Sequence, residues 1–107
     1  MSAIVIFITC PDKKKARAIA GALVKGGLAA CVNIIDAVES IFWWEGTIER
    51  SKEALLIVKS KKIKLKKIIK RVKALHGYKV PEIIALEICG GYKPYLEWLD
   101  ESIRKPH

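Results

Sequence analysis

The longest alternating pattern in the sequence runs through residues 28–60, LAACVNIIDAVESIFWWEGTIERSKEALLIVKS. β-Branched and aromatic residues, which are common in strands, recur through this stretch, and Gly46-Thr47 is its only convincing turn signal. A strand on each side of that turn would approach roughly fifteen residues, whereas strands usually have about five or six. The pattern therefore predicts a β-hairpin that projects beyond the sheet to which it belongs.

An amphipathic helix is predicted on each side of this hairpin. Apolar residues recur with a helical period through residues 16–24, with Asp12 as the N-cap and Gly26-Gly27 as the C-terminal stop. A second apolar stripe runs through residues 65–75, with Ser60 as its N-cap. Both stripes are expected to lie against the sheet.

Two further apolar runs and a C-terminal segment complete the pattern. Residues 3–9 favour a strand in the middle of a sheet, residues 83–88 favour a fourth strand, and Pro94 opens a short terminal helix. This order predicts an α+β fold, a ferredoxin-like βαββαβ sandwich with an extended hairpin between its second and third strands and a C-terminal helix. The 107 residues are expected to form one domain, residues 1–107.

One face of the predicted sheet has no helix to cover it. The two crossover helices of a βαββαβ sandwich lie on the same face, which leaves the opposite face bare. The chain is 51% hydrophobic, which is too apolar to leave a large sheet face in water. Self-association, in a closed ring or a symmetric pair, is therefore expected.

Six sequence blocks, in their order along the chain, resemble the CutA family of divalent-cation tolerance proteins. They are residues 9–11 (TCP), 28–33 (LAACVN), 40–46 (SIFWWEG), 53–59 (EALLIVK), 76–83 (HGYKVPEI) and 95–99 (YLEWL). The resemblance implies a homotrimer of ferredoxin-like subunits whose extended hairpins pair with neighbouring subunits, similar to PII-type signalling trimers. It also implies a link to tolerance of divalent metal ions, copper most often, without an enzymatic activity.

Metal ligands are predicted at His76 and Cys10. His76 matches the histidine of the family's His-Pro-Tyr motif, although Gly77 replaces the proline, and the family's copper-associated cysteine falls near Ile8. Cys10 lies at a strand-to-helix corner, where a helix N-terminus lowers a thiol pKa. We expect a weakly bound divalent ion, copper, shared between subunits near His76. The alternatives are a histidine bonded to the last helical carbonyls and a buried cysteine.

The hairpin and its neighbours supply the predicted subunit contacts. Large aromatic side chains near the turn would be exposed in a monomer. Burying each of them would stabilise the protein by about 1.5–3 kcal/mol. We therefore predict a trimer interface at the turn, with the chain's own helix and a cofactor as alternative partners. Its residues are Phe42, Trp43 and Trp44. An inter-subunit cleft, or a purely structural interface, is predicted at Cys31, Trp44, Glu53, Lys59 and Tyr78.

The formal net charge of +9 is concentrated in one segment. Residues 59–73 contain nine basic residues and no acidic one, which leaves eleven basic against eleven acidic residues elsewhere. A lysine-rich helix face can contact phosphates, or it can keep an apolar trimer in solution. We favour the solvated face, because the central strands that carry base-stacking aromatics in RNA-recognition domains have only Phe7 here. Nucleic acid is therefore disfavoured, and a PII-like regulator of a small ligand or acidic protein partner is the alternative function.

Catalysis and membrane insertion find little support in the sequence. It has no Gly-rich phosphate loop, no G-x-S-x-G elbow and no H-E-x-x-H. Cys31 and His76 are the one pair that could act as a catalytic nucleophile and its base if the fold brought them together. The N-terminus lacks a signal-peptide pattern, its apolar run is too short to cross a bilayer, and three cysteines suit a reducing compartment. We expect a soluble, cytoplasmic binding protein that is not an enzyme.

Overall fold

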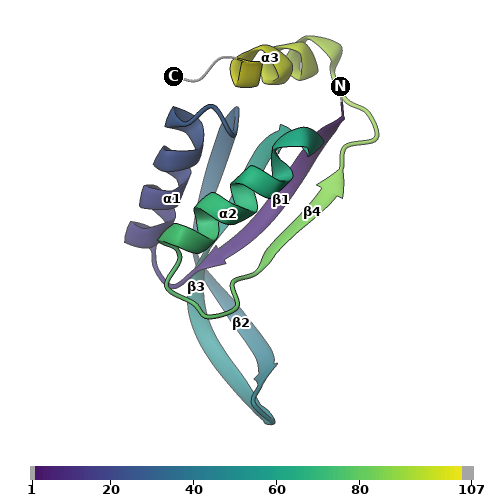
Figure 1. Ribbon diagram of the computed structural model, residues 1–107. Helices are drawn as coiled ribbons and strands as arrows, with labels where there is room; N and C mark the ends of the chain where they lie inside the picture. Colours follow the sequence, from purple (N-terminus) through teal and green to yellow (C-terminus); the bar gives the residue numbers. More distant parts are fainter. Residues whose placement is uncertain (1, 105–107) are drawn as a thin grey trace.

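The computed structural model describes residues 2–104, and the strands in this range form one antiparallel sheet with the order β2-β3-β1-β4. Along the chain the elements are β1 (Ala3–Cys10), α1 (Lys13–Lys25), β2 (Cys31–Trp44), β3 (Thr47–Lys61), the 3-10 turn η1 (Lys62–Lys64), α2 (Leu65–Leu75), β4 (Ile83–Glu87) and α3 (Lys93–Arg104). The crossover helices α1 and α2 lie side by side on one face of the sheet (Figure 1). The predicted α+β, ferredoxin-like βαββαβ order with a C-terminal helix is confirmed.

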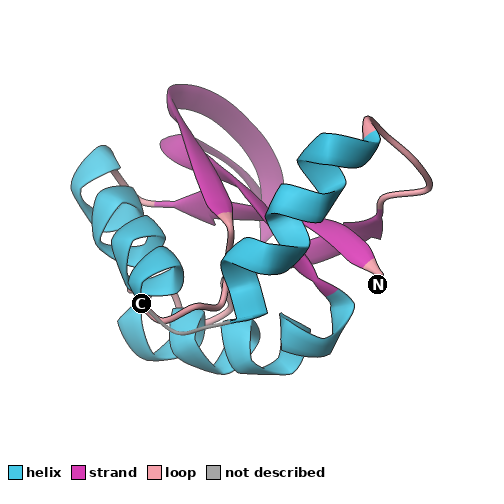
Figure 2. Ribbon diagram, turned by 90° about the horizontal axis from the view of Figure 1, so that it is seen from above, coloured by secondary structure: helices cyan, strands magenta, loops and turns pink. Residues whose placement is uncertain are grey.

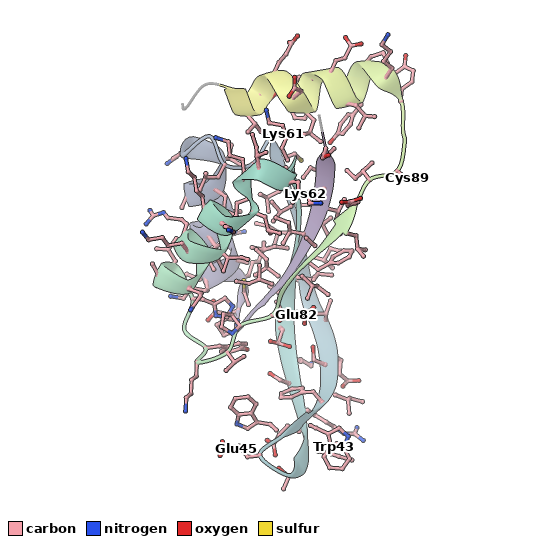
Figure 3. All side chains as sticks on the ribbon, turned by 45° about the vertical axis from the view of Figure 1, so that its right-hand side comes forward. Trp43, Glu45, Lys61, Lys62, Glu82 and Cys89 are labelled. Carbon is pink, nitrogen blue, oxygen red and sulfur yellow. The ribbon has the colours of Figure 1, made fainter. Side chains whose placement is uncertain are left out.

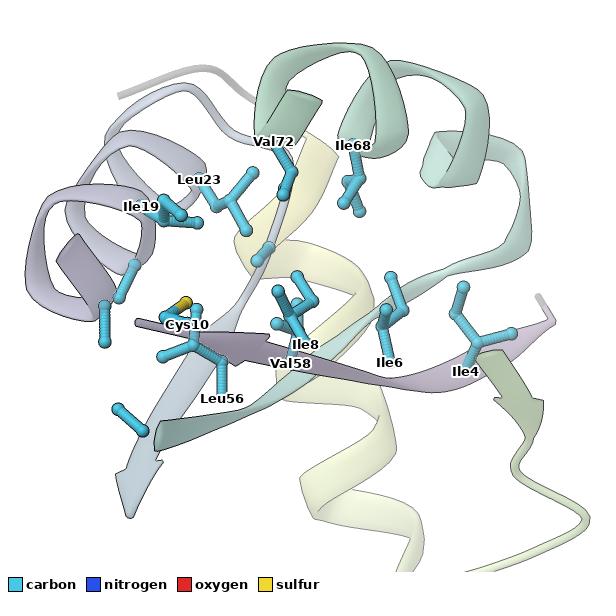
Figure 4. Close-up of a cluster of buried hydrophobic side chains, with 14 residues drawn as sticks. Ile4, Ile6, Ile8, Cys10, Ile19, Leu23, Leu56, Val58, Ile68 and Val72 are labelled. Carbon is cyan, nitrogen blue, oxygen red and sulfur yellow. The ribbon is translucent and has the colours of Figure 1, made fainter. Parts of the chain in front are cut away.

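The core lies between the helices and the sheet, because side chains alternate along the central strand. Ile4, Ile6, Ile8 and Cys10 of β1 point toward the helices and are at most 2% exposed (Figure 4). They pack with apolar residues of α1, α2 and β3, chiefly Ile19, Leu23, Leu56, Val58, Ile68 and Val72. The apolar stripes predicted for the two helices are therefore the faces that they bury.

Both ends of α1 form as the sequence predicts. The Asp12 carboxylate accepts a hydrogen bond of 2.8 Å from the backbone N–H of Lys15, which satisfies one of the unpaired donors of the first turn. At the other end Gly26 is the C-cap, and Gly27 follows with φ +71°, the left-handed conformation that glycine adopts without a Cβ clash.

The predicted N-cap of the second helix at Ser60 is wrong. Ser60 lies inside β3, where its hydroxyl donates a 2.6 Å hydrogen bond to the carbonyl of Leu28. β3 continues to Lys61 because it stays paired with β1 as far as Ala3. α2 therefore begins only at Leu65, after η1. Long-range strand pairing has outweighed the local capping signal.

The hairpin turn is Glu45-Gly46, one residue earlier than predicted. The two residues have φ values of +48° and +82°, as in the type I′ turn whose twist matches that of hairpin strands. Thr47 pairs with Trp44 instead of occupying the turn, and its hydroxyl donates to the Trp44 carbonyl at 3.1 Å. Thr47 is β-branched, so a positive φ there would be strained, whereas Gly46 adopts it freely.

The hairpin extends well beyond the sheet, as predicted. β1 pairs with β3 only over residues 54–61, so residues 47–53 have β2 as their only strand neighbour in the described chain. We call residues 36–53 the hairpin arm. It begins at a bulge where Ala37 has φ +59° and donates its N–H to the Asp36 carboxylate at 2.9 Å. With the arm, the molecule measures 44 × 26 × 22 Å (Figure 1).

The sheet face opposite α1 and α2 is apolar and largely open. Its cross-strand pairs include Val5 with Leu86 and Phe7 with Ile84. Leu86 and Ile84 are 58% and 53% exposed. β4, which carries them, ends at Glu87, one residue short of the predicted strand. The bare face expected from the topology is therefore present.

α3 lies across the end of the sheet that is opposite the hairpin arm (Figures 1 and 2). Leu99 and Ile103 bury against Ala3 in a small second cluster. An ion pair of 3.0 Å between Lys61 and Asp100 joins this helix to the end of β3. α3 thus covers one end of the sandwich and leaves most of the open face uncovered.

Candidate functional site

A groove of about 860 Å³ lies where the hairpin arm leaves the sheet. One wall is the arm, and the other is the segment between α2 and β4, residues 77–82. Figure 3 shows Glu82 near the root of the arm, with Trp43 and Glu45 at its tip. The groove is lined mainly by carboxylates, hydroxyls, aromatic rings and two cations: Thr9, Ser40, Phe42, Trp44, Glu49, Arg50, Ser51, Glu53, Tyr78, Lys79 and Glu82.

A hydrogen bond joins the two walls of the groove. The Tyr78 hydroxyl donates to the buried carboxylate of Glu53 at 2.9 Å. Burial, followed by the hydrogen bond and the negative charge of Glu53, raises the pKa of Tyr78 from 10.0 to about 12. The phenol therefore keeps its proton, and its donation to Glu53, throughout the physiological pH range. This bond ties the segment after α2 to the root of the arm.

His76 uses both of its ring nitrogens within the fold. Nε2 lies 2.6 Å from the carbonyl oxygen of Thr9, and Nδ1 accepts a 3.1 Å hydrogen bond from the backbone N–H of Tyr78. These partners select the neutral tautomer with its proton on Nε2. The last carbonyl of α2, at Leu75, is instead bonded by the ammonium of Lys15 at 3.0 Å. A metal ion at His76 would have to replace one of the two ring hydrogen bonds.

Cys10 is fully buried on the helix side of the sheet. Burial, with further contributions from the negative charges of Glu53 and Asp12, raises the pKa of the thiol to about 11. These effects outweigh the α1 N-terminus, which would favour the thiolate. The alternative of a buried cysteine is confirmed, and the thiol is protonated at neutral pH. As a metal ligand, Cys10 would have to lose this proton.

Carboxylate oxygens are the most accessible ligand atoms of the groove. Glu49 and Glu82 are exposed on its two walls, and the hydroxyl of Thr9 lies 3.4 Å from the Glu82 carboxylate. Such oxygens are the ligands that hard divalent cations prefer. Within residues 2–104, no three His, Cys, Asp or Glu side chains are grouped so that they could hold a metal ion.

The five residues predicted to form an inter-subunit cleft lie at two places in this chain. Trp44, Glu53 and Tyr78 meet in the groove. Cys31 and Lys59 are cross-strand partners at the other end of β2 and β3, and they do not line the groove. One chain therefore brings three of the five together.

The aromatic residues near the turn are exposed in the single chain, as the sequence predicts for a monomer. Trp43 is 72% exposed at the tip of the arm, and Phe42 and Trp44 are also exposed, along the wall of the groove. Their predicted role as a trimer interface depends on the assembly of several copies of the chain.

Sequence reasoning missed four charged residues of the groove, Glu49, Arg50, Lys79 and Glu82. The register of the hairpin contains the signal for two of them, because a turn at Glu45-Gly46 places Glu49 opposite Phe42 and Arg50 next to it. Glu82 is brought to Thr9 only by the pairing of β4 with β1, which no local pattern encodes.

The fold and the groove first define a class of protein, the ferredoxin-like α+β proteins with an extended hairpin arm beside an open sheet face. Within this class, the profile of the family described as CutA1 divalent ion tolerance protein matches residues 4–102. The chain therefore belongs to the CutA1 family.

Relatives from distant organisms match almost the whole chain. The divalent-cation tolerance protein CutA of Thermus thermophilus is 49% identical over 98 residues, 92% of this chain and 95% of that protein. The chloroplastic protein CutA 1 of Oryza sativa is 46% identical over 102 residues, 95% of this chain but 58% of the rice protein. The chain thus spans little more than half the length of that plant relative. The crystal structure of CutA1 from Oryza sativa has a TM-score of 0.95 at 45% identity and covers 98% of this chain and 96% of its own.

The relatives are described from more than one cellular location. The rice protein is chloroplastic, and the structure from Archaeoglobus fulgidus is described as a periplasmic divalent cation tolerance protein. That structure has a TM-score of 0.92 at 42% identity and covers 95% of this chain and 99% of its own. In the part of this chain that the structure describes, none of the helices combines the length and apolar character needed to cross a membrane.

Proposed function

We propose that the chain acts as a homotrimeric, non-enzymatic protein that binds divalent cations in divalent-cation tolerance. The observation that carries this proposal is the uncovered apolar surface of the arm and of the open sheet face, where Trp43 and Leu86 are mostly exposed. Burying a large apolar side chain stabilises by about 1.5–3 kcal/mol. Arms that pair with neighbouring copies, with open faces turned inward, would cover both surfaces in one closed ring.

The mass of the protein in solution tests the assembly. Light scattering after size exclusion at micromolar concentration is expected to give three times the chain mass of 12.0 kDa. The variant Trp43→Ala/Trp44→Ala is expected to dissociate, because it removes the largest apolar surface of the arm. Tyr92→Ala is the matched control, since Tyr92 is 77% exposed but lies outside the arm. A well-folded monomer of the natural chain would contradict the proposal.

We propose that the cation binds weakly in the groove with donors from more than one copy, and that copper is the first ion to test. Glu49 and Glu82 offer exposed oxygens there, whereas His76 contributes only if it gives up a ring hydrogen bond. We expect calorimetric titration to show an affinity for copper that is at least five-fold weaker in Glu49→Gln/Glu82→Gln than in the natural chain. An unchanged affinity would exclude the groove, and an unchanged affinity in His76→Ala would exclude His76.

The control for the metal titration removes the same charge from another surface. Glu97 and Glu101 are exposed on α3, so Glu97→Gln/Glu101→Gln has the same change in net charge without touching the groove. This control is expected to bind copper as the natural chain does. Equal weakening in both double variants would mean that copper responds to net charge and not to a site.

A second candidate function is a PII-like regulator that binds a small ligand between subunits. It is favoured by the groove, whose volume of about 860 Å³ is within the range of small-molecule sites. A ligand of this kind should raise Tm in the presence of excess chelator, and Tyr78→Phe or Lys79→Gln should reduce that rise. A shift in Tm that the chelator abolishes supports the cation instead.

A cytoplasmic location is proposed from the cysteines. Cys10, Cys31 and Cys89 are all free thiols in the described chain, which suits a reducing compartment. Cell fractionation beside a cytoplasmic marker tests this, and recovery with the membrane or secreted fraction would contradict it.

A further inference from the structure

The elements α1, η1 and α2 form one cationic layer, with twelve basic residues and no acidic one. The rest of the chain has eight of the 20 basic residues against all 11 acidic ones. By sequence alone the positive excess belongs to the α2 segment, but the fold places α1 beside it on the same face of the sheet (Figures 1 and 4). Charge is therefore separated between this layer and the remainder of the molecule.

Most basic side chains of the cationic layer are exposed and have no acidic partner. Among residues 2–104, the one ion pair of the layer joins Lys62 to Glu87 at 2.9 Å. Lys15 is used inside the fold, where it joins α1 to the last carbonyl of α2. The exposed basic residues of the two helices are Lys13, Lys14, Arg17, Lys25, Lys66, Lys67, Lys70, Arg71 and Lys73.

The arrangement of these charges opposes helix stability. Residues 13–15 fill the first turn of α1, where the helix dipole favours acidic side chains. On α2, Lys66 lies one turn from Lys70 and Lys67 lies one turn from Arg71. A like-charge pair at this spacing is unfavourable, whereas a surface needed only for solubility could mix both signs and gain from them. The uniform sign points to an anionic partner.

The solvated face that the α2 pattern alone favours does not account for the larger layer that α1 and α2 form together. We infer that the cationic layer binds the phosphate backbone of duplex nucleic acid without regard to base sequence. Lysine outnumbers arginine in the layer. Lysine contacts phosphate as a point charge, whereas arginine can also form the bidentate hydrogen bonds that recognise bases. Neither helix contains an aromatic residue on which the bases of a single strand could stack. A duplex presents phosphates on its outside and needs no stacking partner.

An anionic membrane is the other large surface of phosphates, and the layer fits it less well. Helices that lie in a membrane interface insert large apolar or aromatic side chains beside their cations. Among the described residues of the layer, only one large apolar side chain is exposed beside the cations. This is Ile63, in η1 at the margin of the layer, which is 79% exposed. The layer also lies on the opposite side of the sheet from the open apolar face, so the inference does not depend on trimer formation.

Fluorescence anisotropy with a labelled duplex of about 20 base pairs tests the inference. Affinity should fall linearly with salt on logarithmic axes, and each lost phosphate contact should weaken binding roughly five-fold near physiological salt. Lys66→Gln/Lys70→Gln on α2 and Lys14→Gln/Arg17→Gln on α1 should each weaken binding by about 5–25-fold. The α1 double variant is the more informative of the two. Its residues lie outside the lysine-rich segment of the sequence and join the layer only because the fold places α1 beside α2.

The matched control is Lys52→Gln/Lys93→Gln, which removes two exposed positive charges outside both the layer and the groove. It should weaken binding less than three-fold. All variants should keep the natural circular dichroism spectrum and mass in solution, so a loss of folding or assembly can be recognised separately. A salt-independent affinity, equal weakening by the control, preference for the single strand, or binding to phosphatidylserine vesicles in place of the duplex would each overturn the inference.

Discussion

β3 passes through two environments, and its halves can be compared directly. Residues 54–60 lie between β1 and β2, with Ala54, Leu56 and Val58 fully buried beneath the helices. Among the residues that the structure describes, residues 47–53 pair with β2 alone, and Ile48 in this half is 59% exposed. The sequence differs between the halves as well, because residues 49–53 are all polar whereas residues 54–58 are all apolar.

The comparison teaches that composition indicates which half of β3 the chain itself covers, but not what covers the aromatic residues of the arm. A two-stranded hairpin by itself is only marginally stable in water. The covered half is held by burial against α1 and α2, whereas the arm has its type I′ turn and the Tyr78–Glu53 bond at its root. The remaining stabilisation of the arm must come from another copy of the chain if the proposed trimer is correct.

The largest expected effect is in the covered half. Leu56→Ala removes a fully buried side chain from the core and should lower the free energy of unfolding by about 2–5 kcal/mol, measured by urea denaturation. Leu56→Met, which conserves volume, should cost less than about 1.5 kcal/mol. A loss below 1 kcal/mol for the alanine variant would mean that the two halves are not held differently.

The next effect concerns pH and the buried thiol at the junction of the halves, where Cys10 pairs with Ala54. Its pKa is raised from 9.0 to about 11, so the folded protein holds the thiol proton more tightly than the unfolded chain does. Stability from this source is complete below pH 9 and is lost as pH rises toward 11, by about 2–3 kcal/mol in total. Urea denaturation between pH 8 and 11 should show this loss.

Cys10→Ala separates the titration from the packing. The variant should be less stable at every pH because of the cavity, but its stability should fall less steeply between pH 9 and 11. The phenol of Tyr78 titrates in both proteins, since its pKa is raised chiefly by burial and by Glu53, and the variant removes only the smaller contribution of the Cys10 charge. Parallel stability curves for the two proteins would show that the thiol keeps its ordinary pKa in the fold.

How much of the fold could be predicted from sequence follows from which interactions are local. The alternation of the hairpin, the stripes of the helices and the Asp12 cap act over a few residues, and all appear in the structure. The Ser60 cap failed because the pairing of Lys61 with Ala3, which joins positions more than half a chain length apart, keeps Ser60 inside β3. The turn was displaced by one residue because nothing local signals a positive φ at Glu45.

The candidate site was less predictable, because its bonds join distant segments. Tyr78 and Glu53 were chosen as cleft residues, and they form a hydrogen bond. The role of His76 could not be predicted, since its ring is held by the carbonyl of Thr9, 67 positions away in the chain. The part of the cationic layer that belongs to α1 was missed for the same reason: only the fold places it beside α2.

A smaller effect is expected at the tip of the arm. Gly46 has φ +82° with no atom within 4 Å of an added Cβ, so Gly46→Ala should cost about 1 kcal/mol from backbone strain alone. Gly46→Asn should cost less, because asparagine tolerates the left-handed region. Gly90→Ala is the control, since that position has open space and no positive φ, and its Tm should not fall. Equal costs at both glycines would contradict the type I′ turn.

The smallest effect in an isolated chain belongs to Ile48→Ala, the arm's counterpart of Leu56→Ala in the same strand. Ile48 is largely exposed and loses little beyond its cross-strand contact with Trp43, so the cost should be below about 1 kcal/mol when the protein is dilute. If copies of the chain cover the arm, the cost should grow with protein concentration, because assembly stabilises the folded state by mass action. Denaturation at several concentrations measures this. A cost as large as that of Leu56→Ala at every concentration would show that the arm is held within one chain, and the contrast between the two halves of β3 would disappear.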